Sequence, residues 1–593
     1  MLICLREVLV KMKKVLLSLV ALMLTFNTVN AEVLEDNKVA KINDTMYDTL
    51  DEAVKNATNS DTIELLSDAT LTVGSIDSDK IVTIKGNDFI ISVPSQPGEN
   101  GDLALYGTLN IYNATINFGN EKYWSITMRS NSSLNLYNSE CTVKYHGIYS
   151  NNNSTVNLDN SKMTLSNMDY TAMMTEGRST INVKNKSELV IKDFVFTDNT
   201  EANGTTAYNI NVDDSKILFD GCEKQGMVKG SLILTNGATA EFINCGVGIN
   251  LYSRNEIIVN DGTELTVSNS IERAIMSQGN YYSALIVKKG GKLNITNNGT
   301  RWKKSDDESK YYADKGAITI GIYGYDEEDD MIYIYRTKSI INFEDGALVN
   351  ITNNNSRGIT FSGESAYIGN TTIITNNGGE NVAVGGGIYN IYGNITISAD
   401  AKIYNNHANT SSDDIYNSGE NATIKLVNTG SDWTLDDCND LIDGWYDDNK
   451  ESRWNAHDKG NEYVEEVSSD KYENELTIKA AHGIYGKLIV KYVDTDGNEL
   501  ADEVVSSKKV GTEYNTSKID IDGYRLKEVI GEEDGTYTAD DITVIYVYEP
   551  MGIGGNEDIP DTGIYSNNIL EISIIFSAIA LIGATILKKK LVK

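Results

Sequence analysis

The chain has 593 residues and a formal net charge of −34, and 40% of its residues are hydrophobic. This acidic balance argues against nucleic acid as a partner, because phosphate backbones are bound by clusters of Lys and Arg. The apolar content is too high for a disordered chain. The 49 Gly residues beside only 4 Pro residues favour a turn-rich β protein.

Residues 12–31 have the layout of a secretory signal peptide, with two lysines, an apolar run and a small residue, Ala31. The apolar run is short and a polar chain follows it, so a membrane anchor at this end is the less favoured alternative. We expect cleavage between Ala31 and Glu32 and export of the rest of the chain. Met12 is then the expected start, and residues 1–11 are an artefact of start-site choice.

A short amphipathic helix is predicted near the start of the exported chain, at residues 47–57. Thr49 and Glu52 have the spacing of a capping box. We expect the helix to close the first coil of the repeat array that follows, because an open strand edge would invite aggregation. The apolar residues that share one face of this helix are Leu50, Ala53, Val54 and Ala57.

A phrase of alternating apolar and polar residues, followed by a turn at Asn, Asp or Gly, returns every 22–29 residues from about residue 100. Period-2 alternation predicts strands, and repeats of this length without helical periodicity predict a solenoid. We therefore predict a mostly β fold with a right-handed parallel β-helix over residues 32–480. A β-propeller is the alternative, although its blades are about twice as long. The phrases begin at Leu109, Leu134, Val156, Ile181, Ile210, Leu232, Ile257 and Leu285.

Equivalent positions of successive coils in such a β-helix stack about 4.8 Å apart. The first residue of each phrase is expected to face the core, and the Asn after it to lie outside and stack its amide. The same register places Cys222 and Cys245 one coil apart, as two buried thiols or as a disulfide. In its repeat style the region resembles the pectate-lyase-like β-helix adhesins of bacterial surfaces. The expected amide stack is Asn110, Asn135, Asn157, Asn182 and Asn211.

Residues 301–338 interrupt the repeats and contain two alternating runs on either side of the sequence DEEDD. This pattern predicts a protruding hairpin. Aromatic side chains on such a hairpin are candidates for stacking on sugar faces, and a solvated hairpin without a ligand is the alternative. The candidate ligand-binding residues are Trp302, Tyr323, Tyr325, Tyr333 and Tyr335.

Catalysis is the less favoured interpretation of the β-helix, although this architecture hosts polysaccharide lyases and hydrolases. Such enzymes need paired carboxylates, or calcium-binding acids with a basic residue. Adjacent acids such as Asp413 and Asp414 are common in a chain with 85 acidic residues, and the four His residues are scattered. The NTD, GHG and RIK motifs of polygalacturonase-like enzymes do not occur, nor does a CxxC pair among the five Cys residues. We expect no catalytic site, metal or cofactor, with a lyase or glycosidase as the alternative.

The repeats fade after residues 423–428, and a segment rich in Trp and Asp, residues 441–455, is expected to close the array. Residues 484–550 then change character, with alternating strands around an Asp496-Gly497 turn and a Tyr-rich final strand. The phrases YVDTDGNEL, VGTEY, DGYRL and VIYVY in this order resemble the MucBP (mucin-binding protein) repeat of Gram-positive surface proteins. The resemblance implies a small β-rich module, β-grasp-like in fold, that is associated with mucin or host-glycan adhesion. A spacer role is the alternative.

The last part of the chain, after a linker at 551–558, contains IPDTG, an uncharged apolar run at 572–587 and a basic stub. This order resembles the LPxTG cell-wall sorting signal of Gram-positive surface proteins, with Ile in place of the usual Leu. The resemblance implies that a sortase cleaves between Thr562 and Gly563, removes residues 564–593 and joins Thr562 to peptidoglycan. The run is short for a bilayer, so no stable membrane span is expected after processing. The recognition residues are Ile559, Pro560, Asp561, Thr562 and Gly563.

Together these features predict a secreted, peptidoglycan-anchored surface protein that adheres to host or environmental glycans or to mucin-type glycoproteins. The expected partners are a sortase, peptidoglycan and a mucin or glycan ligand. Two alternatives stay open at this stage. One is a surface polysaccharide lyase or glycosidase on the β-helix, and the other is a structural stalk that binds no ligand.

Overall fold

The computed structural model describes residues 38–95, 102–120, 124–195, 202–252, 254–277, 282–299, 316–326, 331–380, 382–419, 421–437, 439–448, 452–454, 471–483, 485–538 and 540–551. The chain divides into two compact units, the first ending at Ile484 and the second beginning at Tyr485. Strands dominate both units, which confirms the predicted mostly β fold.

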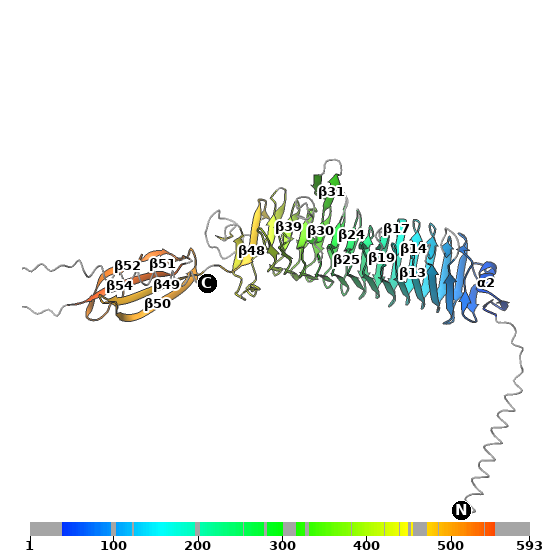
Figure 1. The fold of residues 1–593 in the computed structure, drawn as a ribbon, viewed down its shortest axis with the longest axis horizontal. Helices are drawn as coiled ribbons and strands as arrows, with labels where there is room; N and C mark the ends of the chain where they lie inside the picture. Colours follow the sequence, from blue (N-terminus) through cyan, green and yellow to red (C-terminus); the bar gives the residue numbers. More distant parts are fainter. Residues whose placement is uncertain are drawn as a thin grey trace, which may run out of the picture. The chain divides into compact units, whose positions relative to one another are not determined.

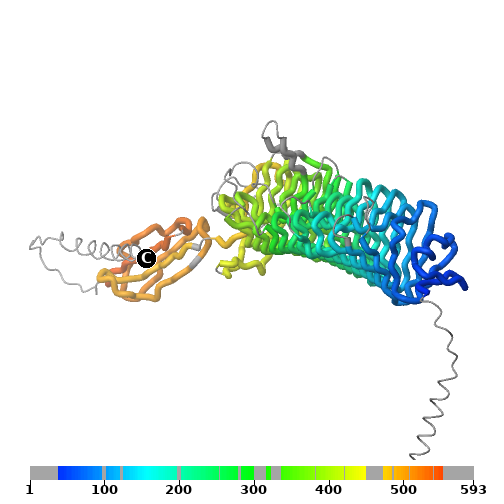
Figure 2. Tube along the Cα trace, turned by 45° about the vertical axis from the view of Figure 1, so that its right-hand side comes forward, coloured from blue at the N-terminus to red at the C-terminus, as the bar shows by residue number. Residues whose placement is uncertain are grey.

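Unit 1 is a parallel β-solenoid, and each coil contributes a strand to each of three faces (Figure 1). We name these faces A, B and C in the order in which the chain passes through them. Successive coils pair in parallel and in register, so that Leu134 lies between Leu109 and Val156 on face A. This pairing confirms the predicted parallel β-helix and excludes the propeller, whose blades are antiparallel sheets. Figure 2 shows the coils stacked in sequence order along the unit.

Face A contains β3 (Thr62–Leu65), β6 (Ile81–Lys85), β9 (Thr108–Tyr112), β12 (Ser133–Tyr137), β15 (Thr155–Asp159), β22 (Leu232–Thr235), β25 (Glu256–Val259), β28 (Ala284–Val287), β33 (Ile340–Phe343), β36 (Ser365–Ile368), β40 (Asn394–Ile397) and β44 (Thr423–Lys425). Face B contains β4 (Ala69–Thr70), β7 (Ile90–Pro94), β10 (Thr115–Asn120), β13 (Glu140–Tyr145), β16 (Lys162–Ser166), β18 (Glu188–Lys192), β20 (Lys216–Asp220), β23 (Thr239–Ile243), β26 (Glu264–Ser268), β29 (Lys292–Thr296), β34 (Leu348–Thr352), β37 (Thr372–Thr375) and β41 (Lys402–Tyr404). Face C contains β5 (Ser75–Ile76), β8 (Leu103–Leu105), β11 (Ile126–Met128), β14 (Ile148–Ser150), β21 (Gln225–Val228), β24 (Val247–Leu251), β27 (Arg273–Ser277), β30 (Gly316–Ile320), β35 (Arg357–Phe361), β39 (Ile388–Asn390) and β43 (Ile415–Asn417). The long strands β17 (Met173–Lys184) and β19 (Asn203–Asp213) turn the corner from face C to face A, and β38 (Gly378–Gly379) pairs with β42 (His407–Ala408) beyond the end of face B.

The inner and outer positions of face A are those that the alternating phrases predict. The side chains that begin the first five phrases are at most 2% exposed, which places them in the core. The Asn residues next to them form the predicted outer stack, in which each amide after the first donates to the Asn of the preceding coil over 2.6–2.9 Å. The core residues are Leu109, Leu134, Val156, Ile181 and Ile210, and the stacked amides are Asn110, Asn135, Asn157, Asn182 and Asn211.

Asn residues also make the sharp turns between the faces. Asn138 and Asn160, between faces A and B, have φ of 49° and 46°. Asn269 and Asn297, just after face B, have φ of 56° and 57°. Asn tolerates this left-handed conformation better than most residues because its short polar side chain bonds locally. The turns therefore recur at the same place in each coil, and the coils stay in register.

Helix α2 (Leu50–Asn56) lies at the first end of the solenoid, beside the antiparallel pair β1 (Ala40–Ile42) and β2 (Thr45–Tyr47). The Thr49 hydroxyl accepts a hydrogen bond from the Glu52 backbone N–H at 3.2 Å, which caps the helix. Its inward face covers the first coil. The buried residues are Leu50, Ala53, Val54 and Ala57, all at most 6% exposed.

Antiparallel strands cover the other end of the solenoid. Strand β48 (Leu476–Ala481) pairs with β43 and β45 (Gly444–Asp447), and β47 (Lys471–Tyr472) pairs with β44. Strand β46 (Ser452–Arg453) pairs antiparallel with β45. Trp433 and Trp445, each 2% exposed, cover the core there, and the indole of Trp445 donates to the Val427 carbonyl at 2.8 Å. The Trp- and Asp-rich segment of the sequence thus lies in this cap.

The insertion at 301–338 contains an antiparallel hairpin of β31 (Ile322–Asp326) and β32 (Met331–Tyr335) that projects from the coils (Figure 1). Unit 2 is a four-stranded sheet in the order β50 (Glu499–Lys509), β49 (Tyr485–Asp494), β54 (Ile542–Pro550) and β52 (Tyr524–Ile530). A second pair, β51 (Glu513–Asn515) and β53 (Asp534–Thr536), packs beside this sheet. The described residues of unit 2 contain no helix.

Candidate functional site

The inner face of the unit 2 sheet is built from tyrosines. Tyr492 of β49 and Tyr546 of β54 stack with their ring centroids 5.6 Å apart, and both are at most 5% exposed. The alternation of the Tyr-rich strand places Val544, Tyr546 and Tyr548 on this face. The tyrosine rings therefore supply most of the small core, while each hydroxyl needs a polar partner.

The tyrosine hydroxyls fasten the loops that cover the sheet. Tyr548 donates to the Ile519 carbonyl at 2.7 Å and accepts from the Ile519 N–H at 3.1 Å. Tyr546 donates to a Glu533 carboxylate oxygen at 3.0 Å, and burial raises the pKa of this phenol. Such bonds fix the covering loops in place, so the inner face has no room for a ligand.

The outer face of unit 2 is the surface that this packing leaves exposed. Ile489 pairs with Val505, and Ile530 pairs with Ile545, which brings four apolar residues to this side of the sheet. Val505 is 46% exposed and Ile530 is 42% exposed. Two ion pairs flank these residues, Lys491–Glu503 at 3.6 Å and Arg525–Glu549 at 2.7 Å. We call this surface, Ile489, Val505, Ile530 and Ile545 with the two ion pairs, the outer apolar face.

The DTDGN sequence of unit 2 forms the predicted hairpin turn between β49 and β50. The Asp494 carboxylate accepts hydrogen bonds from the backbone N–H groups of Asp496 and Asn498 at 2.9 and 2.8 Å. Gly497 follows with a φ of 85°, which favours glycine. The bonds from Asn498 and its neighbours hold the pKa of Asp494 below its usual value. Among the described residues, no group of three or more acidic, His or Cys side chains could hold a metal ion.

Several residues that the sequence proposes as sites lie outside the described residues. They include the expected signal peptide at 12–31 with Ala31 and Glu32, the sorting residues and the removed segment 564–593. Trp302 also lies outside them. The tyrosines of the insertion lie on its two strands, with Tyr323 opposite Ile334 and Tyr333 opposite Gly324. The sorting residues are Ile559, Pro560, Asp561, Thr562 and Gly563, and the other two tyrosines are Tyr325 and Tyr335.

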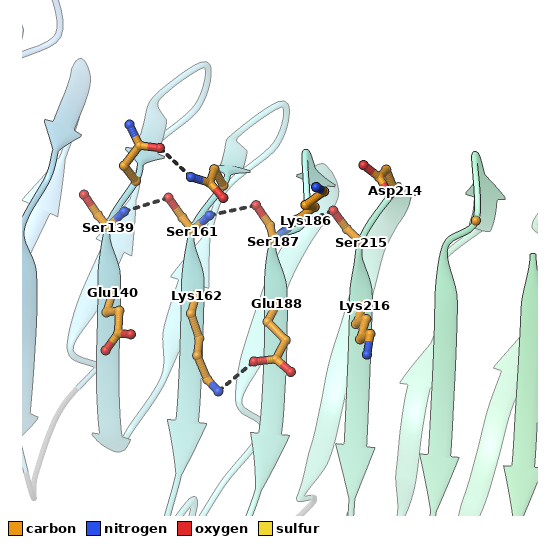
Figure 3. Close-up of a pocket in the computed structure, with 13 residues that line it drawn as sticks. Ser139, Glu140, Ser161, Lys162, Lys186, Ser187, Glu188, Asp214, Ser215 and Lys216 are labelled. Carbon is orange, nitrogen blue, oxygen red and sulfur yellow. Dashed lines mark hydrogen bonds and ion pairs between the residues drawn. The ribbon is translucent and has the colours of Figure 1, made fainter.

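A cavity of about 530 Å³ lies over the turns between faces A and B (Figure 3). Buried serines stack along its floor, and the backbone N–H of each donates to the hydroxyl of the next at 2.9–3.0 Å. Charges alternate from coil to coil beside them, and Lys162 lies 2.6 Å from Glu188. The lining has three lysines and three carboxylates, so it carries no net charge that would select a ligand. The stacked serines are Ser139, Ser161, Ser187 and Ser215.

A second stack of Asn residues runs inside the core, just beyond face B. Each side-chain amide donates to the side-chain oxygen of the next coil over 2.7–2.9 Å, and all are at most 2% exposed. The stack ends at Asp414, whose carboxylate accepts from the Asn406 amide at 2.8 Å and from the Ala480 N–H of β48 at 2.7 Å. Burial raises the pKa of Asp414 to about 7. The stacked residues are Asn298, Asn354, Asn377 and Asn406.

Asp413 and His407 line a cavity of about 400 Å³ beside this point. The Asp413 carboxylate accepts from the Ala408 N–H at 2.8 Å, and burial raises its pKa. His407 lies 3.0 Å from Asp436. The hydrogen bond from the Ala480 N–H to Asp414 fastens β48 to the last coil. Asp414 is only 1% exposed, so it is out of reach of a polymer substrate. Asp414 therefore secures the cap, while Asp413 and His407 face the cavity beside it.

Of the three described His residues, His407 and His482 both line this cavity, while His146 lies elsewhere on the solenoid. His146 lies 3.3 Å from Asp169, and a ring nitrogen of His482 lies 2.9 Å from the Leu441 carbonyl. Cys222 and Cys245 occupy equivalent positions of adjacent coils, as the repeat predicts, and both are free, fully buried thiols. Burial raises the pKa of Cys222 well above its ordinary value, so these thiols behave as core residues.

Comparisons with known proteins identify the module at the end of the described chain. Residues 487–549 match the model of the MucBP domain, so unit 2 contains a MucBP domain. The muramidase-released protein of Streptococcus suis is 43% identical over 82 residues, which cover 12% of this chain and 6% of that protein. The chain thus spans a small fraction of this relative. A crystal structure of the periplasmic alginate epimerase AlgG aligns over 52% of this chain and 84% of the epimerase chain. The sequence identity is 13% and the TM-score is 0.18, so the two structures do not superpose closely. Within the residues that the structure describes, no helix is long and apolar enough to cross a membrane.

Sequence reasoning missed the inner Asn stack, the serine stack and the outer apolar face. The first had a visible signal, because Asn-Asn follows face B in four coils, at 297–298, 353–354, 376–377 and 405–406. The first Asn of each pair makes the left-handed turn and the second enters the core. The outer apolar face had no such signal, because it depends on which strands become neighbours in unit 2.

Proposed function

We propose that the protein is a surface adhesin that binds mucin-type glycoproteins or related glycans through its MucBP domain. The observation that carries this proposal is the match of residues 487–549 to the MucBP domain, in a unit with its own core. The outer apolar face supports it by offering exposed aliphatic side chains between polar pairs. Interfaces of this kind combine an apolar centre with a polar rim.

The outer apolar face is the proposed contact surface, because the inner face is filled by tyrosines and their loops. The double substitution Val505→Glu and Ile530→Glu places two carboxylates in the centre of this face. We expect it to weaken the binding of residues 32–550 to mucin-coated plates by about tenfold or more, which corresponds to about 1.4 kcal/mol. Circular dichroism checks that the variant keeps its β structure.

A matched control uses two equally exposed apolar residues of the solenoid. Ile90 is 39% exposed and Leu348 is 44% exposed, and both lie on face B. The pair Ile90→Glu and Leu348→Glu adds the same charge to the same chain. Equal losses of mucin binding in the two double variants would show that charge alone causes the effect and would remove the outer apolar face from the proposal.

The proposal includes attachment to the cell wall through the IPDTG motif. We expect mass spectrometry of wall fragments from the producing cells to find Thr562 joined by an amide bond to a peptidoglycan amine. Thr562→Ala is expected to release the protein into the medium or leave it in the membrane fraction. Recovery of wall-bound protein with an intact C-terminus would contradict this part of the proposal and leave the binding part standing.

We propose a binding role in preference to a catalytic one for the solenoid. Of the two adjacent acids there, Asp414 is buried and engaged in holding β48, and the Asp413 carboxylate accepts from the Ala408 N–H. A lyase or glycosidase would release unsaturated or reducing ends from polysaccharides, and we expect none from residues 32–550. A structural stalk would show neither this activity nor mucin binding.

A further inference from the structure

A groove of about 690 Å³ follows the corner at which face C turns into face A. It spans successive coils of the solenoid. Two long strands, β17 and β19, form the middle of this corner. Its polar and aromatic lining includes Asn151, Asn152, Glu176, Arg178, Lys229 and Tyr252.

The groove carries excess positive charge in a chain whose net charge is −34. Arg178 and Lys229 are both exposed, and Glu176 is the single carboxylate in the lining. Neither cation forms an ion pair with any carboxylate among the residues that the structure describes. By contrast, the cavity of Figure 3 balances three lysines with three acids. Unneutralised cations at this corner therefore favour an anionic ligand.

The single carboxylate is already occupied by neighbours. Glu176 accepts a hydrogen bond from the Asn151 amide at 2.9 Å. Burial, together with a hydrogen bond to Glu176, raises the pKa of the Tyr149 hydroxyl to about 12, so this phenol stays a neutral donor. Glu176 thus holds the floor of the groove in place through its hydrogen bonds with Asn151 and Tyr149.

Aromatic rings and amides complete a surface suited to a sugar. The Lys229 ammonium lies 4.9 Å from the centroid of Tyr252, which is 37% exposed. Farther along the same corner, Arg129 lies over the Tyr106 ring at 5.7 Å, and Tyr106 is also 37% exposed. Aromatic faces with polar tips pack against sugar rings, and planar guanidinium groups match carboxylate and sulfate oxygens.

The backbone of the corner is held in a shape that ordinary residues avoid. Ala207 and Lys229 both have left-handed φ values, 64° and 57°, in the groove lining. A Cβ added to Gly177 would lie 2.6 Å from the Asn152 side-chain oxygen, so the chain passes directly under this amide. Left-handed non-glycine residues cost about 1 kcal/mol or more each and cluster at binding surfaces.

From these observations we propose that the corner groove is a second binding site, specific for an acidic oligosaccharide that bears a carboxylate or a sulfate group. Arg178 and Lys229 bind the anionic group, Asn152 contacts a sugar hydroxyl, and Tyr252 packs against a sugar ring. This site is independent of the MucBP domain and its outer apolar face. It would give the solenoid a ligand of its own.

Isothermal titration calorimetry of residues 32–550 with sialyllactose, sulfated lactose and neutral lactose tests the proposal. We expect at least one acidic sugar to bind at least tenfold more tightly than lactose, and the tighter of the two identifies the anionic group. Arg178→Gln with Lys229→Gln is expected to lower that affinity at least tenfold. Lys162→Gln with Lys216→Gln, in the balanced cavity of Figure 3, removes the same charge and is expected to leave the affinity unchanged.

The outcomes separate this proposal from the proposed function. Val505→Glu with Ile530→Glu, on the MucBP domain, is expected to bind the acidic sugar normally. If this variant loses the sugar while Arg178→Gln with Lys229→Gln keeps it, the sugar site is in unit 2 and the groove proposal is wrong. Equal binding of lactose and the acidic sugars, or no binding of any of them, also overturns it. Neither result bears on mucin binding by the MucBP domain.

Discussion

Asn377→Ala is expected to lower the free energy of unfolding of the solenoid by about 3–5 kcal/mol. Asn377 is 1% exposed and lies in the middle of the inner Asn stack. It accepts from the Asn354 N–H at 3.3 Å and side-chain amide at 2.7 Å, and it donates to Asn406 at 2.9 Å and to the Ile351 carbonyl at 2.8 Å. The substitution removes these buried hydrogen bonds and opens a cavity in the core.

The matched control is Asn157→Ala, in the outer stack. Asn157 donates to Asn135 at 2.6 Å and accepts from Asn182 at 2.7 Å, but it is half-buried, so water can replace both partners. We expect a loss below about 1 kcal/mol. Urea unfolding followed by circular dichroism measures both variants. A loss for Asn377→Ala no larger than that for Asn157→Ala would show that the inner stack adds little to stability.

Stability of the capped end is expected to fall as the pH rises from about 4 to about 7, because of Asp414. Burial raises the pKa of this carboxyl from 3.8 to about 7 in the folded chain. The folded state therefore holds a proton that the unfolded state has released, and stability decreases across this window and levels off above it. At about 1.4 kcal/mol per pH unit, the full window corresponds to about 4 kcal/mol. Asp413 is the charged neighbour of this carboxyl, and Asp448, Lys479 and His407 are the ionisable side chains that act on Asp413.

Asp414→Asn removes this titration while keeping the size of the side chain. Its amide would face the Ala480 N–H, so the variant loses one hydrogen bond at every pH. The measurement is therefore the difference in unfolding free energy between pH 5 and pH 8 in each protein. We expect that difference to be about 3 kcal/mol smaller in the variant. The same pH dependence in both proteins would show that Asp414 does not titrate as its burial requires.

Period-2 alternation made the coils predictable, because one buried face leaves a strand only one register. Leu134 and Asn135 therefore lie where the sequence places them, inside and outside the same strand. The capping helix was equally readable, since Thr49 and Glu52 carry a local signal that needs no knowledge of the rest of the fold.

Features that join distant parts of the chain were harder to foresee. Asp414 meets Ala480, 66 residues away, only because β48 reverses direction and closes the last coil. The corner groove likewise combines Arg178 and Tyr252 from different coils, and neither stands out in its own phrase. The adjacent acids Asp413 and Asp414 show that a visible sequence signal can also be ambiguous. Their spacing is as compatible with catalysis as with the cap that the structure forms.

Removal of residues 485–550 tests the central claim, mucin binding by the MucBP domain, most directly. Binding of residues 32–550 to purified mucin is measured by surface plasmon resonance beside the chain that ends at residue 484, whose core is separate. We predict clear, saturable binding by the longer chain and its loss in the shorter one. Equal binding by the two chains, or saturable binding by neither, would contradict the account.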